Sequence, residues 1–107
     1  MKIDLLRKPA EHMDTVIIMH GEKGDFHSIE YLPDHIKNAV SVIIKQDEYT
    51  FGYKSLKSFP LVHARHRSNI ILCGVGNTHD LDCSRLRELF ALCFRAALKL
   101  GAREVYL

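Results

Sequence analysis

The sequence lacks several features that would define a protein class at once. It contains no tryptophan, no internal repeat, no Gly/Ser/Pro-rich linker and no apolar run near the roughly 20 residues that cross a bilayer. Its cysteines, Cys73, Cys83 and Cys93, form no C-x-x-C pair, which argues against a disulfide framework. The opening MKIDLLRKPAEHMD carries charges throughout and lacks a signal-peptide core. We therefore expect a single cytoplasmic domain over residues 1–107 without a membrane segment.

An excess of one charge is also missing. Fifteen Lys and Arg residues balance 13 Asp and Glu residues, so the formal net charge is only +2. This balance favours solubility and does not indicate a polyanionic partner. The apolar fraction of 47% is that of a globular protein. The seven histidines would add positive charge as the pH falls from about 7 to about 5.5.

The first half of the sequence predicts strands and one helix. Residues 1–6 are compatible with a short strand, and the apolar run at 14–20 predicts a strand covered on both faces, followed by turn residues at 21–28. Pro33 in a first turn and apolar positions spaced three and four residues apart over 36–44 predict a helix. Residues 47–58 are ambiguous and predict either a loop or a loop with a short strand at 49–53.

The second half predicts a hairpin and a βαβ unit. Residues 59–66 alternate like an edge strand, and a tight turn at 67–69 leads into a buried strand over 70–74. An amphipathic helix from Asp82 to Leu100 follows, with Asp82 as its N-cap, Leu100 in its apolar stripe and Gly101 as its left-handed C-terminal residue. A last strand ends the sequence. Such crossovers build a parallel sheet flanked by helices, which places the chain in the α/β class.

The buried strand ends in Gly74-Val75-Gly76, a candidate phosphate-binding turn. The dinucleotide fingerprint requires a third glycine at the position of His79, and the Gly-Lys-Ser/Thr of a P-loop is also absent. We therefore expect these glycines to serve backbone geometry. Contact of Gly74, Val75 and Gly76 with a ligand remains the alternative.

Other candidate sites are weaker. His63 and His66 would point to opposite faces of one strand, so we expect dispersed surface histidines and no metal ligands. Because Gly-x-Ser-x-Gly and cysteine-nucleophile signatures are missing, no catalytic residue is predicted. Cys73, Cys83 and Cys93 are all expected to be small buried hydrophobic residues. Cys83, in the first turn of the long helix, is either a spacer beside the cap or mildly reactive. Basic residues form either solvated faces or a nucleic-acid contact: Arg65, His66, Arg67, Arg85, Arg87 and Arg95.

The last 40 or so residues resemble the N-terminal domain of the leucine aminopeptidase family. That family typically shows an apolar strand ending in Gly-Leu-Gly, a polar stretch, Leu-Thr capping a long helix, and Leu-Gly before a basic residue and a valine-containing strand. The corresponding segments here are 70–76, Leu81-Asp82, Leu100-Gly101 and 103–105. Upstream, DTVIIMHGEKG is similar to the family's early strand, and IKNAVSVIIKQDEYTFGYKS to its helix and loop. The departures are Cys73 for Val, Val75 for Leu and Asp82 for Thr, all conservative for packing or capping.

The resemblance implies a macro-domain-like, three-layer α/β sandwich with a mixed, largely parallel sheet. It implies an N-terminal accessory domain cut from a longer two-domain aminopeptidase, whose separate catalytic domain holds two divalent ions (Zn or Mn). The family signatures Asn-Thr-Asp-Ala-Glu-Gly-Arg and Phe-Asp-Ser-Gly-Gly are absent, so no catalytic residue, cofactor or metal ligand is assigned to this chain. The expected partners are the chain's own catalytic domain and, in the parent enzyme, further copies in a hexamer.

Three functions remain open after this comparison. The first is a non-catalytic domain that serves assembly, stability or substrate access in a cytosolic metalloaminopeptidase. The second is a macro-like module that binds ADP-ribose or another nucleotide, although the Asn-Ala-Ala-Asn-type motif of macro domains is missing. The third is a DNA-binding accessory domain, which the small net charge favours least.

Overall fold

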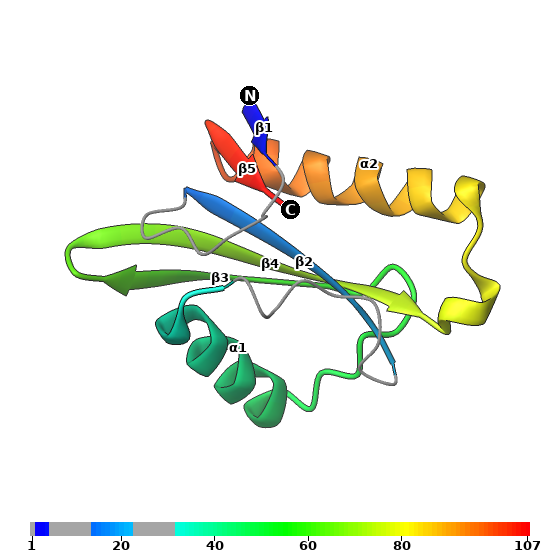
Figure 1. Ribbon diagram of the computed structural model, residues 1–107, viewed down its shortest axis with the longest axis horizontal. Coiled ribbons are helices and arrows are strands. Elements are labelled where there is room, and N and C mark those ends of the chain that lie inside the picture. The colour runs from blue at the N-terminus through cyan, green and yellow to red at the C-terminus, as the bar shows by residue number, and fades with distance from the viewer. Residues whose placement is uncertain (1, 5–13, 23–31) are drawn as a thin grey trace.

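The computed structural model describes residues 2–4, 14–22 and 32–107 (Figure 1). The helices and strands in these ranges are β1 (Lys2–Asp4), β2 (Thr15–Gly21), α1 (Asp34–Gln46), β3 (Leu56–His63), β4 (His66–Gly76), the 3-10 helix η2 (Thr78–Asp80), α2 (Cys83–Lys99) and β5 (Glu104–Tyr106). The strands form one five-stranded sheet in the order β1-β5-β2-β4-β3. Neighbours are parallel except β3, which is antiparallel to β4. The predicted α/β class and mixed, largely parallel sheet are confirmed.

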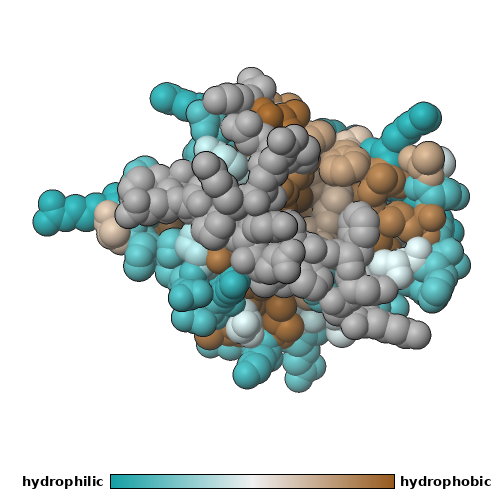
Figure 2. Space-filling view, in the orientation of Figure 1, coloured by the Kyte–Doolittle hydropathy of each residue, from teal (hydrophilic) through white to brown (hydrophobic). Residues whose placement is uncertain are grey.

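The helices cover opposite faces of the sheet, which makes three layers (Figure 1). Side chains of β2 alternate between two hydrophobic clusters: Val16 and Ile18 pack with Ile36 and Val40 of α1, whereas Ile17 packs on the other face. The second cluster brings together Ile17, Ile71, Cys73, Val75, Leu89, Cys93, Ala97 and Val105. Burial on both faces explains why β2 is a continuous apolar run. On the face shown in Figure 2, hydrophilic side chains lie mostly along the rim, with apolar side chains between them.

The βαβ prediction is confirmed by β4, α2 and β5, with β2 lying between the two strands. The carboxylate of Asp82 accepts a hydrogen bond of 2.8 Å from the backbone N–H of Arg85, so Asp82 is the N-cap. At the other end Gly101 has φ +75°, as a left-handed C-terminal residue should. The predicted apolar stripe is wrong at Leu100, which is 42% exposed because it caps the helix instead of packing under it.

Of the two interpretations of residues 47–58, the loop without a strand at 49–53 agrees with the structure up to Ser55, whereas the predicted position of the hairpin turn is wrong. Residues 49–53 do not form a strand, because positive φ angles at Phe51 and Lys54 break the extended path and β3 begins only at Leu56. The hairpin turn does not lie at residues 67–69. It consists of Ala64 and Arg65, with φ of 51° and 65°, and β4 already begins at His66. This left-handed conformation is usually adopted by Asn or Gly. An alanine and an arginine therefore did not indicate a turn at these positions in the sequence.

The remaining predictions are the two N-terminal strands, the first helix and the edge strand. β2 and α1 lie where predicted, and β1 covers the middle of the predicted strand at 1–6. Residues 5, 6 and most of the predicted turn at 21–28 lie outside the described residues. β3 pairs on one side only among the described strands and alternates in exposure, as an edge strand does. An edge position also explains how the sheet tolerates Pro60.

Candidate functional site

The predicted Gly74-Val75-Gly76 turn lies at the carboxyl ends of β2 and β4. The helices that follow these two neighbouring strands lie on opposite faces of the sheet (Figure 1). In open α/β sheets, such a point is where ligands usually bind. All three residues are buried and form the last part of β4 rather than an open loop.

The backbone of this turn is hydrogen-bonded to the protein's own 49–55 loop, defined here as residues 49–55. The N–H of Gly74 donates to the Ser55 carbonyl oxygen at 2.8 Å, and the N–H of Gly76 donates to that of Phe51 at 3.0 Å. The Gly74 carbonyl accepts from the N–H of Lys54 at 3.1 Å. A phosphate cradle offers free N–H groups to its ligand. Here two of these groups already have protein acceptors.

The same loop explains why these positions are glycines. A Cβ at Gly74 would collide with the carbonyl oxygen of Gly52 and the hydroxyl of Ser55. Gly76 has φ +72°, and a Cβ there would lie 3.0 to 3.3 Å from atoms of Tyr53. Both glycines therefore allow the loop to approach the strand closely, which agrees with the structural interpretation of the motif.

Internal hydrogen bonds hold the 49–55 loop in its shape. The Ser55 hydroxyl donates to the Gly52 carbonyl at 2.6 Å, and the Tyr49 hydroxyl lies 2.9 Å from both the Ser55 hydroxyl and the Ser55 carbonyl oxygen. Burial raises the pKa of Tyr49, so its hydroxyl stays protonated and can donate. The ring of Phe51 packs edge-on against Tyr49, with centroids 4.5 Å apart, and lies 4.6 Å from the ring of His20 on β2.

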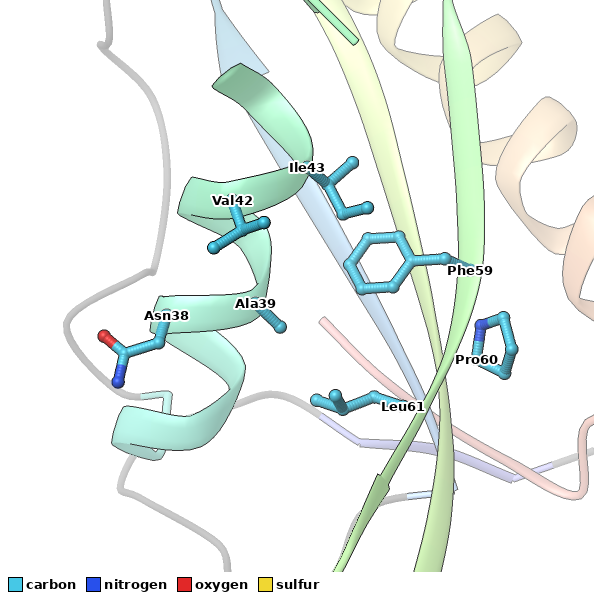
Figure 3. Close-up of a pocket in the computed structure, with 7 residues that line it drawn as sticks. All are labelled: Asn38, Ala39, Val42, Ile43, Phe59, Pro60 and Leu61. Carbon is cyan, nitrogen blue, oxygen red and sulfur yellow. The ribbon is translucent and has the colours of Figure 1, made fainter. Parts of the chain in front are cut away.

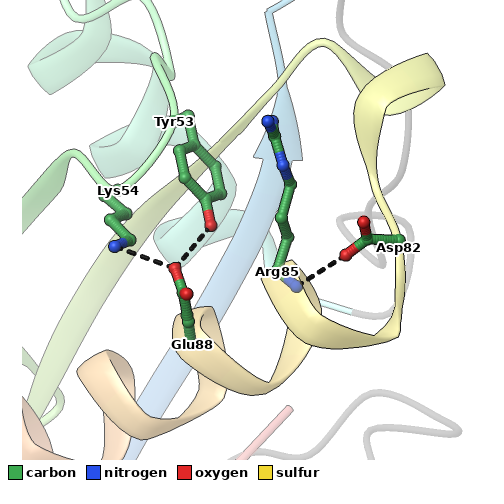
Figure 4. A network of polar contacts seen from close by, with 5 residues as sticks. All are labelled: Tyr53, Lys54, Asp82, Arg85 and Glu88. Carbon is green, nitrogen blue, oxygen red and sulfur yellow. Dashed lines mark hydrogen bonds and ion pairs between the residues drawn. The ribbon is translucent and has the colours of Figure 1, made fainter.

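A polar network fastens the loop to α2 (Figure 4). The Glu88 carboxylate accepts a hydrogen bond of 2.9 Å from the Tyr53 hydroxyl and pairs with the Lys54 ammonium at 2.8 Å. The Arg85 guanidinium lies 5.1 Å from the centroid of the Tyr53 ring. Lys54, followed by Tyr53, lowers the pKa of Glu88. These groups are exposed and screened by water, so the network orients the loop more than it stabilises the fold.

Sequence reasoning did not find this network. Tyr53 and Glu88 lie 35 positions apart, and neither belongs to a motif. Only the placement of the loop over the end of β4 brings them together. Of the basic residues singled out in the sequence, Arg85 belongs to this network, whereas Arg65 and Arg67 lie exposed near the hairpin turn.

The prediction that His63 and His66 point to opposite faces of one strand is wrong. His63 and His66 lie directly opposite each other in the register of β3 and β4, because the chain turns between them. Directly opposite residues share one face of a sheet. The ring of His35, from the first turn of α1, stacks on that of His63 with centroids 3.9 Å apart and planes inclined by 7°. Within the described ranges, no three His, Cys, Asp or Glu side chains are arranged to hold a metal ion.

The cysteines divide into a buried pair and an exposed residue. Cys73 and Cys93 are fully buried between β4 and α2, as expected. The Sγ of Cys93 donates a hydrogen bond to that of Cys73. This bond, together with burial, strongly raises the pKa of Cys93, and it lowers the pKa of Cys73. The expected burial is wrong at Cys83, which is exposed because it lies in the first turn of α2, outside the buried stripe of Leu89, Cys93 and Ala97. Burial keeps solvent reagents away from both Cys73 and Cys93, so only Cys83 is placed to react with them.

A groove of about 350 Å³ lies between α1 and β3 (Figure 3). Ala39 and Ile43 of α1 point toward Phe59 and Leu61 of β3. Asn38, Val42 and Pro60 complete its lining. We call this the α1–β3 groove. It is almost entirely apolar, and no sequence motif indicated it.

No protein-family model and no curated protein matches this chain. The suggested family therefore rests on the residue pattern alone. In the part of the chain that the structure describes, no helix is long and apolar enough to cross a membrane.

Proposed function

We propose that this chain is a non-catalytic accessory domain of a leucine aminopeptidase-like metallopeptidase. It serves assembly, stability or substrate access, while a separate catalytic domain with two divalent metal ions hydrolyses peptides. The observation that carries the proposal is the seating of the 49–55 loop on the predicted ligand turn, where the N–H groups of Gly74 and Gly76 donate to protein carbonyls. The place where an α/β sheet usually binds its ligand is used here for internal packing.

The arrangement of the fold also supports the proposal. The resemblance implies a three-layer sandwich with a mixed sheet, and the described strands and helices form such layers. The departures from the family pattern are compatible with this fold: Cys73 and Val75 are buried in the sheet, and Asp82 caps α2.

An activity assay tests the non-catalytic role. The purified chain is incubated with leucyl-p-nitroanilide and either Mn²⁺ or Zn²⁺, beside a full-length leucine aminopeptidase as positive control. We expect no release of nitroaniline above the rate without protein. Turnover that depends on added metal and disappears with EDTA would overturn the proposal.

The competing nucleotide-binding function is tested separately. Isothermal titration with ADP-ribose should give no binding heat at millimolar ligand, because two backbone donors of the turn are already engaged. A saturable heat that is lost when the turn is altered would favour a macro-like binding module instead.

A further inference from the structure

The strand β3 forms one edge of the sheet, and half of its backbone groups point away from β4. It pairs with β4 alone among the described strands. Hydrogen-bonded and non-hydrogen-bonded pairs alternate along an antiparallel ladder, and a two-residue turn closes on a hydrogen-bonded pair, here His63 and His66. The N–H and C=O groups that point outward are therefore those of residues 56, 58, 60 and 62. The N–H of Asn69, which lies opposite Pro60, agrees with this pattern because it donates at 2.8 Å to the Asp14 carbonyl oxygen, on the β2 side of β4.

Most of the features that protect a sheet edge from other chains are missing in β3. The strand has 8 residues, more than the usual length of about five or six, and its register with β4 contains no bulge. Val62 is 70% exposed and Leu56 is 37% exposed. The one permanently charged side chain of the strand, Lys57, is paired with Asp47. A long, regular and apolar edge of this kind pairs readily with a strand of another chain.

Pro60 interrupts the outward row of backbone groups near its centre. A proline has no N–H, and its ring fills the place where the hydrogen would be. At an outward position this removes a donor from the edge and leaves the bonds to β4 intact. A proline at position 59 or 61 would instead break the ladder that holds the hairpin together. The position of Pro60 therefore affects a strand that approaches from outside, and not the sheet itself.

We propose that Pro60 prevents β3 from pairing with the β3 strand of a second copy of this chain. The second copy is the partner because β3 is self-complementary when two strands are aligned antiparallel over residues 56–62. Leu56 then lies opposite Val62, the two Phe59 rings meet across the strands, and no two like charges oppose each other. Pro60 opposes this pairing, because the Ser58 carbonyl of each copy faces the proline ring of the other copy instead of an N–H donor.

The test replaces Pro60 and measures self-association by analytical ultracentrifugation, at chain concentrations from about 10 µM to about 1 mM. Pro60→Val restores the missing N–H and adds a residue that favours strands. We expect this variant to associate with a dissociation constant at least about tenfold lower than that of the wild type. Pro60→Thr, which is more polar, should shift the association in the same direction. Variants that are folded and associate no more than the wild type would overturn the proposal.

Two controls show whether any association uses the outward groups of β3. Val62→Pro, added to Pro60→Val, moves the proline two positions along the same outward row and should return association to the wild-type level. Pro33→Ala replaces a proline at the start of α1, away from the edge, and should leave association unchanged within about twofold. Association of Pro60→Val that persists with Val62→Pro, or that Pro33→Ala reproduces, would contradict the proposal.

Hydrogen exchange in the wild-type chain tests the open edge itself, and circular dichroism shows that each variant is folded. The amides of Phe59 and Leu61 point toward β4 and should exchange slowly, whereas those of Ser58 and Val62 point outward and should exchange fast. Equally slow exchange at Ser58 and Val62 would show that the edge is already covered, which would overturn the proposal. The accessory role proposed above does not depend on these results.

Discussion

The backbone N–H of Gly74 donates a hydrogen bond of 2.8 Å to the carbonyl oxygen of Ser55. This bond joins the end of β4 to a loop that precedes β3. The N–H of Gly76 likewise donates to the Phe51 carbonyl oxygen. In the sequence the Gly74-Val75-Gly76 turn looks like a ligand cradle, but these two bonds give it an internal, structural role. The predictions below follow from this arrangement and from the residues around it.

Replacement of Gly74 should damage the fold. A methyl group in Gly74→Ala would collide with the carbonyl oxygen of Gly52, so we expect a loss of about 3 kcal/mol in the free energy of unfolding. Gly52→Ala is the matched control, because no heavy atom of the described residues lies within 4 Å of its added Cβ. Its effect should stay within about 0.5 kcal/mol in urea unfolding. Similar losses in both variants would contradict the seating of the loop on Gly74.

The N-cap of α2 can be tested with a pair of aspartates. Asp82→Ala removes the acceptor for the Arg85 N–H and should cost about 1 kcal/mol of stability. Asp80→Ala, in the short η2 helix just before it, should change stability by less than about 0.5 kcal/mol. Thermal unfolding of both variants gives the comparison, and a larger effect of Asp80→Ala would contradict the assignment.

The Glu88 network predicts a pH dependence with a defined sign. Lys54 and Tyr53 lower the pKa of Glu88 in the folded chain. The ionised Glu88 therefore stabilises the fold fully above its unfolded-state pKa of about 4.3. This stabilisation is lost as the pH falls through the lower pKa of the folded state. Glu88→Gln should therefore be less stable than wild type at pH 7, and the difference should shrink as the pH falls below about 4. In a Lys54→Met background most of this difference should vanish. A difference that grows toward acid pH would contradict the network.

The thiols should differ sharply in reactivity. In the folded chain, Ellman's reagent should modify the exposed Cys83 and leave Cys73 and Cys93 unmodified. Cys83→Ser should remove the fast reaction, and all remaining thiols should react once urea unfolds the chain. Fast modification of two thiols in folded Cys83→Ser would show that the core around α2 opens readily.

The hairpin turn offers a stabilising substitution. Arg65 adopts φ 65°, a conformation that glycine accepts without steric cost. Arg65→Gly should therefore raise stability by about 0.5 kcal/mol, the relief of steric cost exceeding the added freedom of the unfolded chain. The same change at the exposed helical position Arg87 should lower stability by about 1 kcal/mol. Destabilisation by Arg65→Gly in urea unfolding would argue against the turn at residues 64 and 65.

Local patterns predicted the regular elements well. The continuous apolar run of β2, the three-and-four spacing in α1 and the cap residues Asp82 and Gly101 each have a direct physical cause within a few positions. The hairpin turn was misplaced because Ala64 and Arg65 hold left-handed conformations imposed by the strands they connect. Their residue types carry no such signal.

The candidate site was less predictable than the fold. The glycine turn could be found in the sequence, but its occupation by Ser55 and Phe51 depends on the path of a loop whose residues lie about 20 positions earlier. The contact of His35 with His63 likewise joins a helix and a strand that only packing brings together. Long-range contacts of this kind leave no periodic pattern for sequence reasoning to use.

The most direct test of the structural role is an NMR titration that follows the amide signals of Gly74 and Gly76 as ADP-ribose is added. We predict that both signals stay in place up to millimolar ADP-ribose, and that both amides exchange slowly with solvent, because each donates to a carbonyl of the 49–55 loop. A saturable movement of these two signals, with fast exchange in the free chain, would show an open binding turn and would contradict the account.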